Sequence, residues 1–86
     1  MANPLTYRQR AKMHDKEANA FDKMAKLQMQ DANAVYGPLN AASTIADWAA
    51  VVVLFEKAHA YDRESDNHAT QRDAYNVLAD AAGEPA

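Results

Sequence analysis

The 86-residue sequence contains no cysteine, only two glycines and only three prolines. Without cysteine, the chain can form neither a disulfide nor a thiolate metal site. Two glycines are too few for a glycine-rich phosphate-binding loop. The only serines, Ser43 and Ser65, occupy positions that suit helix caps, so no activated nucleophile stands out. We therefore expect a protein that is not an enzyme and that carries no cofactor.

Long apolar runs are also missing. The longest one, residues 48–55, is far shorter than the roughly 20 residues that a membrane-spanning helix needs. The first residues do not combine a basic leader with an apolar core, as a secretory signal would. We expect a cytoplasmic protein without a membrane partner, in the host cytoplasm if the chain is phage-encoded.

Alanine is abundant, and no segment alternates apolar and polar residues as a strand does. The glycines and prolines lie near residue 4, near residues 37–38 and at the end of the chain. This pattern predicts one all-α domain over residues 1–86, with helices at about 5–36, 39–62 and 67–82. The expected fold is a long antiparallel hairpin plus a shorter third helix, a three-helix bundle that assembles into a dimeric or higher helical bundle.

Helix boundaries follow from local signals. Asn3 or Thr6 can cap the first helix, and Gly37 suits a left-handed position after its end. The polar run 62–67 predicts a turn between the second and third helices. Because neither glycine nor proline lies in that run, one continuous helix over 44–82 is the alternative. The second helix has three candidate caps, which are Asn40, Ser43 and Thr44.

The first helix carries a heptad seam, in which apolar residues recur at spacings of four and three. Alanine fills every second seam position, which favours close approach of another helix. His14 and Gln28 are the two polar residues within it, and we expect His14 to form a hydrogen bond across the helix interface. His68 should be exposed. The seam consists of Tyr7, Ala11, His14, Ala18, Phe21, Ala25, Gln28, Ala32 and Val35.

The segment Ile45–Phe55 is apolar on nearly every side of a helix. A hairpin partner covers only one side of it, and the third helix offers few large apolar groups. The remaining surface predicts self-association or binding of another protein. The candidate apolar contact residues are Trp48, Val51, Val52, Leu54, Phe55 and Tyr61.

Charge is distributed unevenly along a chain whose net charge is −3. Residues 1–39 hold six basic and four acidic residues, whereas residues 40–86 hold three basic and eight acidic ones. Five cations share one side of the first helix, and we name them the basic stripe: Arg8, Lys12, Lys16, Lys23 and Lys26. This stripe is a candidate surface for an acidic protein partner. The alternatives are a solvated side that pairs with Asp62, Asp66, Asp73 and Asp80, or a weak contact with DNA, although the negative net charge makes nucleic acid a poor partner.

Glu56 and His59 are separated by the spacing that metal-binding helical bundles use for a carboxylate and an imidazole. In that spacing alone they resemble the ligands of ferritin-like proteins. The resemblance implies a further glutamate from a neighbouring helix, and Glu17 is the candidate. A carboxylate–histidine metal site at Glu17, Glu56 and His59 is therefore an alternative to a solvated pair on a charged helix.

Small size, alanine-rich helices and the lack of a chemical motif favour a protein-binding function. The leading hypothesis is a non-enzymatic interaction protein, such as a small phage-type inhibitor or regulator that binds a host protein. The two alternatives are the metal-binding bundle and the weak DNA-binding regulator. The sequence does not identify the partner.

Overall fold

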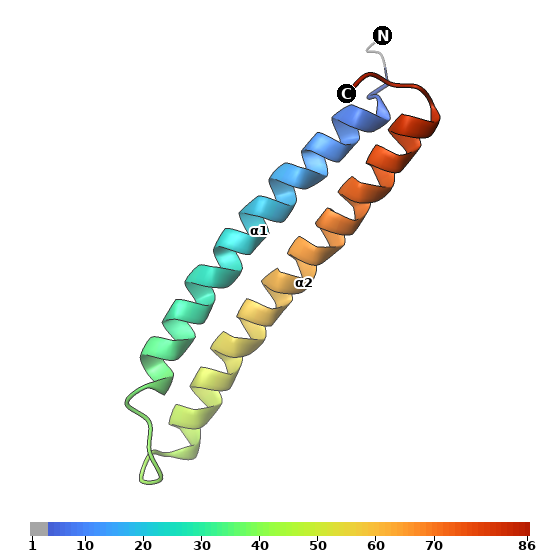
Figure 1. Cartoon of the computed structure of the whole chain (residues 1–86). Coiled ribbons are helices and arrows are strands. Elements are labelled where there is room, and N and C mark those ends of the chain that lie inside the picture. Colours follow the sequence, from blue (N-terminus) through green and yellow to red (C-terminus); the bar gives the residue numbers. More distant parts are fainter. Residues whose placement is uncertain (1–3) are drawn as a thin grey trace.

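The computed structural model describes residues 4–86 as a hairpin of two long helices joined by a short loop (Figure 1). Helix α1 spans Tyr7–Tyr36 and helix α2 spans Ile45–Ala81. The two helices run antiparallel, so the start of α1 and the C-terminus lie at the end of the hairpin opposite the loop. No strand occurs within residues 4–86. The all-α expectation is therefore confirmed, whereas the third helix and the three-helix bundle are wrong.

Helix α2 continues without a break through the polar run 62–67, where a turn was expected. The run contains no residue that stops a helix. Ser65 faces α1 and donates a hydrogen bond of 2.8 Å from its hydroxyl to the carbonyl oxygen of Ala18. The polar residues around it are mostly exposed, so one solvated stretch of a continuous helix accounts for them.

Threonine caps the N-terminus of each helix. The hydroxyl of Thr6 accepts a hydrogen bond from the backbone N–H of Gln9, and the Gln9 side chain accepts one from Thr6 in return. Thr44 and Asp47 form the same reciprocal pair at the start of α2. Each capping box satisfies two backbone donors that a helix otherwise leaves without partners. Asn3, the other expected cap of α1, lies outside the described residues.

The two glycines behave differently. Gly37 has φ of −52°, so the expected left-handed conformation is wrong there, and its N–H simply continues the helical pattern to the carbonyl of Asn33. Gly83 has φ of +72°. The backbone N–H of Glu84 donates a hydrogen bond to the carbonyl oxygen of Ala79, and the N–H of Gly83 donates one to the carbonyl oxygen of Asp80. These two bonds are the Schellman pattern that ends a helix, and it favours glycine at this position.

The end of the chain caps the beginning of α1. The carboxylate of Glu84 accepts hydrogen bonds from the backbone N–H groups of Tyr7, at 3.1 Å, and Arg8, at 2.9 Å. A carboxylate at a helix N-terminus also interacts favourably with the helix dipole. The Arg8 side chain extends the contact by donating to the carbonyl oxygen of Pro85. This bridge fixes the register of the hairpin at its open end.

The core of the hairpin is a single row of small residues in each helix. In α1 the row is Ala11, Ala18, Ala25 and Ala32, all at most 5% exposed, and we call it the alanine line. It confirms that the four alanines of the nine-residue seam predicted from the sequence are core residues. Helix α2 contributes Val51, Ala58 and Ala79, and Ser65 and Arg72 occupy the same heptad row between them. Small side chains let the two backbones approach closely, as expected from the sequence.

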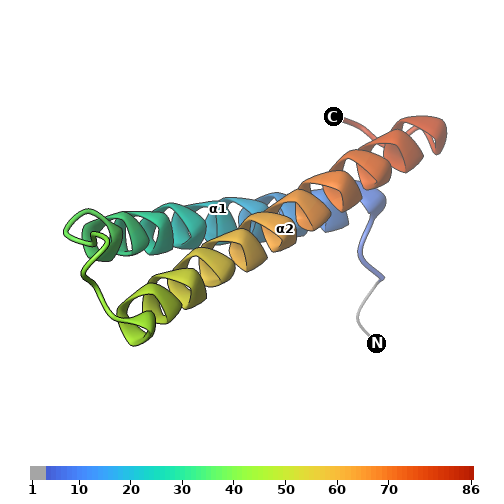
Figure 2. The same ribbon diagram turned by 90° about the horizontal axis from the view of Figure 1, so that it is seen from below.

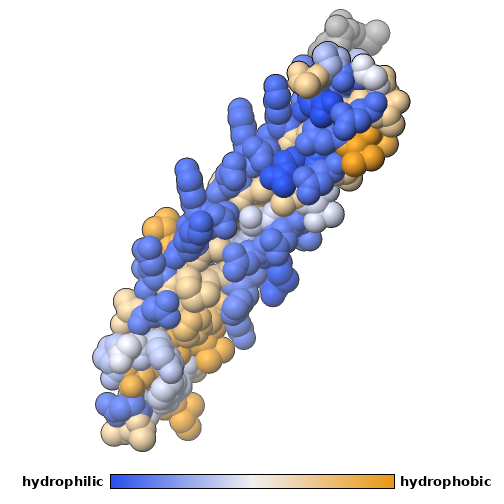
Figure 3. All heavy atoms as spheres, viewed as in Figure 1, coloured by the Kyte–Doolittle hydropathy of each residue, from blue (hydrophilic) through white to orange (hydrophobic). Residues whose placement is uncertain are grey.

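The hairpin is thin and elongated, with extents of 62 × 26 × 15 Å and a radius of gyration of 19.0 Å. A globular chain of this length has a radius of gyration of about 12 Å. The two helices cross at a shallow angle and form one layer (Figure 2). On the face drawn in Figure 3, hydrophilic side chains are most frequent in the half nearer the termini, where one hydrophobic patch lies at the edge, and hydrophobic residues are more frequent towards the loop end. Within the described residues, neither helix is both long enough and apolar enough to span a membrane.

Candidate functional site

The alanine line separates two sides of the hairpin that differ in chemistry. On one side, six rings from both helices stack in succession, and we call this set the ring ladder. Neighbouring ring centroids lie 5.1–6.2 Å apart, a range typical of favourable aromatic contacts. From the termini towards the loop, the ladder is Tyr7, Tyr75, His14, His68, Phe21 and Tyr61.

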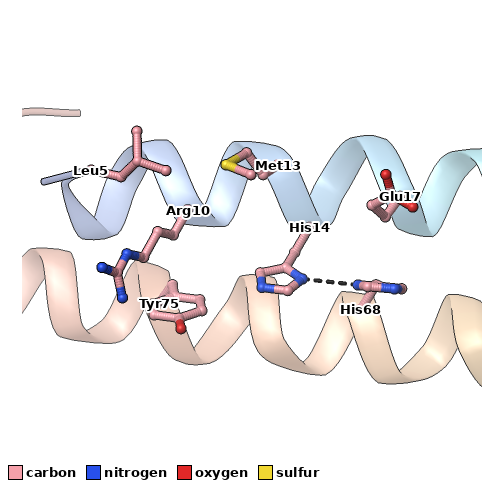
Figure 4. Close-up of a pocket in the computed structure, with 7 residues that line it drawn as sticks. All are labelled: Leu5, Arg10, Met13, His14, Glu17, His68 and Tyr75. Atoms are coloured by element: carbon pink, nitrogen blue, oxygen red, sulfur yellow. Dashed lines mark hydrogen bonds between the residues drawn. The ribbon is translucent and has the colours of Figure 1, made fainter. Parts of the chain in front are cut away.

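Two histidines meet at the middle of the ladder. The Nδ1 atoms of His14 and His68 are 2.9 Å apart. One Nδ1–H therefore donates a hydrogen bond, and the Nδ1 atom of the other ring accepts it. Figure 4 shows the two rings pointing toward each other between the helices. The His14 ring also stacks on Tyr75, and the His68 ring stacks on Phe21. The expected hydrogen bond of His14 across the interface is present, whereas His68 is half-buried and its expected exposure is wrong.

A shallow groove of about 350 Å³ opens beside this histidine pair. Its lining is mainly apolar, and the guanidinium of Arg10 lies 5.9 Å from the centroid of the Tyr75 ring. We call the side of the hairpin that carries the ring ladder and this groove the ladder face. The groove is lined by Leu5, Arg10, Met13, His14, Glu17, His68 and Tyr75.

The opposite side of the alanine line is ionic, and we call it the ionic face. Arg8 donates to Asp80 at 2.7 Å and to the side chain of Asn76 at 2.9 Å. Arg72 pairs with Asp15 at 2.8 Å and with Asp73 at 3.0 Å. The contacts of Arg8 and the pair of Arg72 with Asp15 cross between the helices and flank a second shallow groove of about 280 Å³, whereas Arg72 and Asp73 are neighbours on α2. Each helix therefore contributes both a cation and an acid to the cross-helix pairs of the ionic face.

Neighbouring carboxylates raise the pKa of two basic side chains, Arg72 on the ionic face and Lys26 in the basic stripe. The pKa of Arg72 is raised first by its hydrogen bond to Asp73 and then by its hydrogen bond to Asp15. The pKa of Lys26 is raised first by its hydrogen bond to Asp22, one turn earlier on α1. Both groups are at the surface, so solvent screens these pairs and they add little stability. Of the three pairs, only that of Arg72 with Asp15 joins the two helices.

The basic stripe is only partly neutralised by the hairpin itself. Arg8 is bound to Asp80, and Lys26 is bound to Asp22 within its own helix. Lys12, Lys16 and Lys23 are exposed and form no ion pair within residues 4–86. Of the four acids expected to pair with the stripe, only Asp80 does so. Three lysines thus remain available to a partner.

The apolar candidates divide into core and surface residues. Val51 is 2% exposed and packs within the hairpin, and Leu54, Phe55 and Tyr61 are half-buried. Phe55 takes part in an edge-on contact with the ring of Tyr36, which also contacts Trp48. The residues that stay exposed from the predicted set are Trp48, at 38%, and Val52, at 50%.

The structure does not bring the alternative metal ligands together. Glu17 precedes Ala18, which contacts Ser65 of α2, so Glu17 lies at the level of Ser65 along the hairpin. Glu56 lies nine residues before Ser65 on α2. Nine residues of helix correspond to about 13 Å. Within residues 4–86, no three histidine, aspartate or glutamate side chains lie close enough to hold a metal ion. Glu56 and His59 are both exposed.

The sequence prediction missed the part of the ladder that α2 supplies. The polar run 62–67 predicts a turn, and a turn there would interrupt the pattern that continues to the end of α2. The signal was present, because ladder and core positions alternate at spacings of three and four. Together they are Val51, Leu54, Ala58, Tyr61, Ser65, His68, Arg72, Tyr75 and Ala79. Polar residues at Ser65 and Arg72 concealed the continuity.

Three comparisons, with protein-family models, with curated proteins and with solved structures, find no match to this chain.

Proposed function

We propose that the protein is a non-enzymatic protein-binding protein, a small inhibitor or regulator of the phage type that docks on an acidic surface of a host protein. The observation that carries this proposal is the row of exposed lysines on α1. Lys12, Lys16 and Lys23 lie within twelve residues of one helix, a distance of about 17 Å along its axis. A rigid row of positive charges favours a partner of complementary charge and speeds its association.

The acids of α2 make nucleic acid a poorer candidate than protein. Asp73 and Asp80 bind arginines on the ionic face, and Asp66 lies one heptad before Asp73 on the same side of α2. A nucleic acid backbone would meet these carboxylates next to the lysines and be repelled by them. A protein surface can present both signs of charge and match both rows.

Self-association is a second part of the proposal. Ile45 is 89% exposed, Val53 is 56% exposed and Val52 is 50% exposed, although the hairpin is complete. Side chains of this kind stabilise a protein by roughly 1.5–3 kcal/mol when they are fully removed from water. A small domain that leaves such groups uncovered gains stability from oligomerisation.

The test of partner binding is affinity capture from the cells that naturally make the protein. The captured protein is then measured against a triple variant, Lys12→Glu, Lys16→Glu and Lys23→Glu. We expect the variant to bind at least about tenfold more weakly, and we expect binding of the original chain to weaken as salt rises.

The matched control reverses an exposed cation away from both the basic stripe and the ladder face, Arg63→Glu, and should leave the affinity within about twofold. Equal binding by the triple variant would remove the lysine row as the contact surface. Loss of the captured material after nuclease treatment would instead support the DNA-binding alternative.

A further inference from the structure

We propose that the ladder face is a homodimer interface, which a second copy of this chain covers with its own ladder face to form a four-helix bundle. This inference rests on the proposed self-association and assigns the surface that performs it. It is independent of the proposed partner binding through the lysines of α1.

The ladder face is apolar beyond the groove beside the histidines. Met13 lines that groove and is 55% exposed. In this hairpin, residues seven apart share a side, as the alanine line shows. The row through Met13 continues with Ala20, Leu27 and Ala34, and Leu27 is 60% exposed. Met24, which is 40% exposed, lies one heptad after the groove residue Glu17.

Helix α2 adds apolar groups to the same side. Leu78 follows the ladder residue Tyr75 by three positions and is 45% exposed, and Val53 precedes the half-buried Leu54. Together with the half-buried rings, these groups form an apolar strip along much of the hairpin. The ionic face has no such strip on α1, because Lys12, Lys16, Lys23 and Lys26 occupy the corresponding positions.

The charges of the ladder face nearly cancel. Arg10 and Glu17 line the groove, and Asp31 lies two heptads after Glu17 on α1. On α2, Glu64 and Lys57 lie two and three heptads before Leu78. Two cations stand against three acids, so a second copy meets no strong charge of its own sign. A two-fold symmetric contact places the same patch on both partners, which this near-neutrality permits. The five charges are Arg10, Lys57, Glu17, Asp31 and Glu64.

The area of the hairpin fits a dimer of this kind. A compact monomer of 9.5 kDa exposes about 5,000 Å². The hairpin exposes 6272 Å², which is about 1,200 Å² more. A stable interface buries about 800 Å² on each partner. Covering one face to this extent therefore removes about two thirds of the excess exposed surface of each chain.

The thickness of the two-helix layer also favours a four-helix bundle made of two hairpins. The hairpin is 15 Å thick and 26 Å wide. Helices pack at interaxial distances of about 8–10 Å, so a second layer at this distance gives a cross-section of about 25 Å in both directions. That is the square cross-section of a four-helix bundle, and its central core would contain both ring ladders.

The test is the molar mass in solution, measured by sedimentation equilibrium on the full chain and two variants. We expect a mass of twice 9.5 kDa for the original chain at about 100 µM. Leu27→Glu, on the ladder face, should weaken dimerisation at least tenfold. Val77→Glu is the matched control, since Val77 is 67% exposed, follows Asn76 of the ionic face and should leave the dimer intact.

Each alternative outcome is decisive. A monomer at every concentration overturns the proposal and the proposed self-association, but not the partner binding through lysines. Dissociation by Val77→Glu with a stable Leu27→Glu dimer overturns only the choice of face. Circular dichroism checks that the variants keep their helices, and Leu78→Lys, the same test from α2, replaces Leu27→Glu if that variant unfolds.

Discussion

Gln28 occupies the row of α1 that supplies Tyr7, His14 and Phe21 to the ring ladder, and its side-chain oxygen is buried without a hydrogen-bond partner in the described part of the chain. A buried acceptor without a partner costs about 1–3 kcal/mol. We expect Gln28→Leu to raise the free energy of unfolding by about 1 kcal/mol or more, as measured by urea denaturation.

Gln30→Leu is the control for the glutamine substitution, because Gln30 is exposed and should change stability by less than about 0.5 kcal/mol. A destabilised Gln28→Leu variant would contradict the prediction. In that case the side chain of Gln28 would have a hydrogen-bond partner in solution, supplied by the second copy that covers the ladder face.

At the scale of the helices, the continuity of α2 is the feature that distinguishes this hairpin from a three-helix bundle. Asp66 lies in the middle of α2 with its side chain exposed. Proline at this position removes a helical hydrogen bond and clashes with the preceding turn, at a cost of about 3 kcal/mol. We expect Asp66→Pro to lower the unfolding free energy by this amount, measured by urea denaturation.

Asp66→Ala separates the backbone effect from loss of the carboxylate, and it should be neutral or slightly stabilising because alanine favours helix. If residues 62–67 formed a turn in solution, proline would be tolerated there and the two variants would have similar stability.

The two helices were predictable from the sequence to different degrees. For α1, Thr6 at its start, Gly37 after its end and a seam of alanines with rings identified its extent to within two residues. For α2, the polar composition of residues 62–67 predicts a turn, although the run contains neither glycine nor proline. A polar residue such as Ser65 is acceptable in a core row when its hydroxyl finds a carbonyl of the other helix, and one sequence does not show that contact.

The candidate surfaces show the same limit. The position of His14 in the seam predicted its hydrogen bond, but its partner His68 depends on the register of the hairpin. That register is fixed by cross-helix contacts, such as those of Arg8 with Asp80 and Arg72 with Asp15. Periodicity therefore identified the sides of each helix, whereas pairing between the helices required the three-dimensional structure.

At the scale of the whole molecule, the shape of the assembly distinguishes between the two apolar regions of the hairpin. Stacking on the ladder face adds a second layer about 10 Å away and keeps the length of 62 Å. Association through the loop end, where Ile45 is 89% exposed, nearly doubles the length. Small-angle X-ray scattering measures both the radius of gyration and the maximum dimension of the assembly.

We expect the radius of gyration to rise only from 19.0 Å to about 20 Å on dimerisation, because the added layer lies close to the centre of mass of the first. End-to-end association would raise it to about 36 Å, because the two centres of mass would then lie about 62 Å apart. Ile45→Lys is the matched control and should leave the scattering of a ladder-face dimer unchanged. Scattering from a rod of twice the length, abolished by Ile45→Lys, would place the contact at the loop end and leave the ring ladder exposed to solvent.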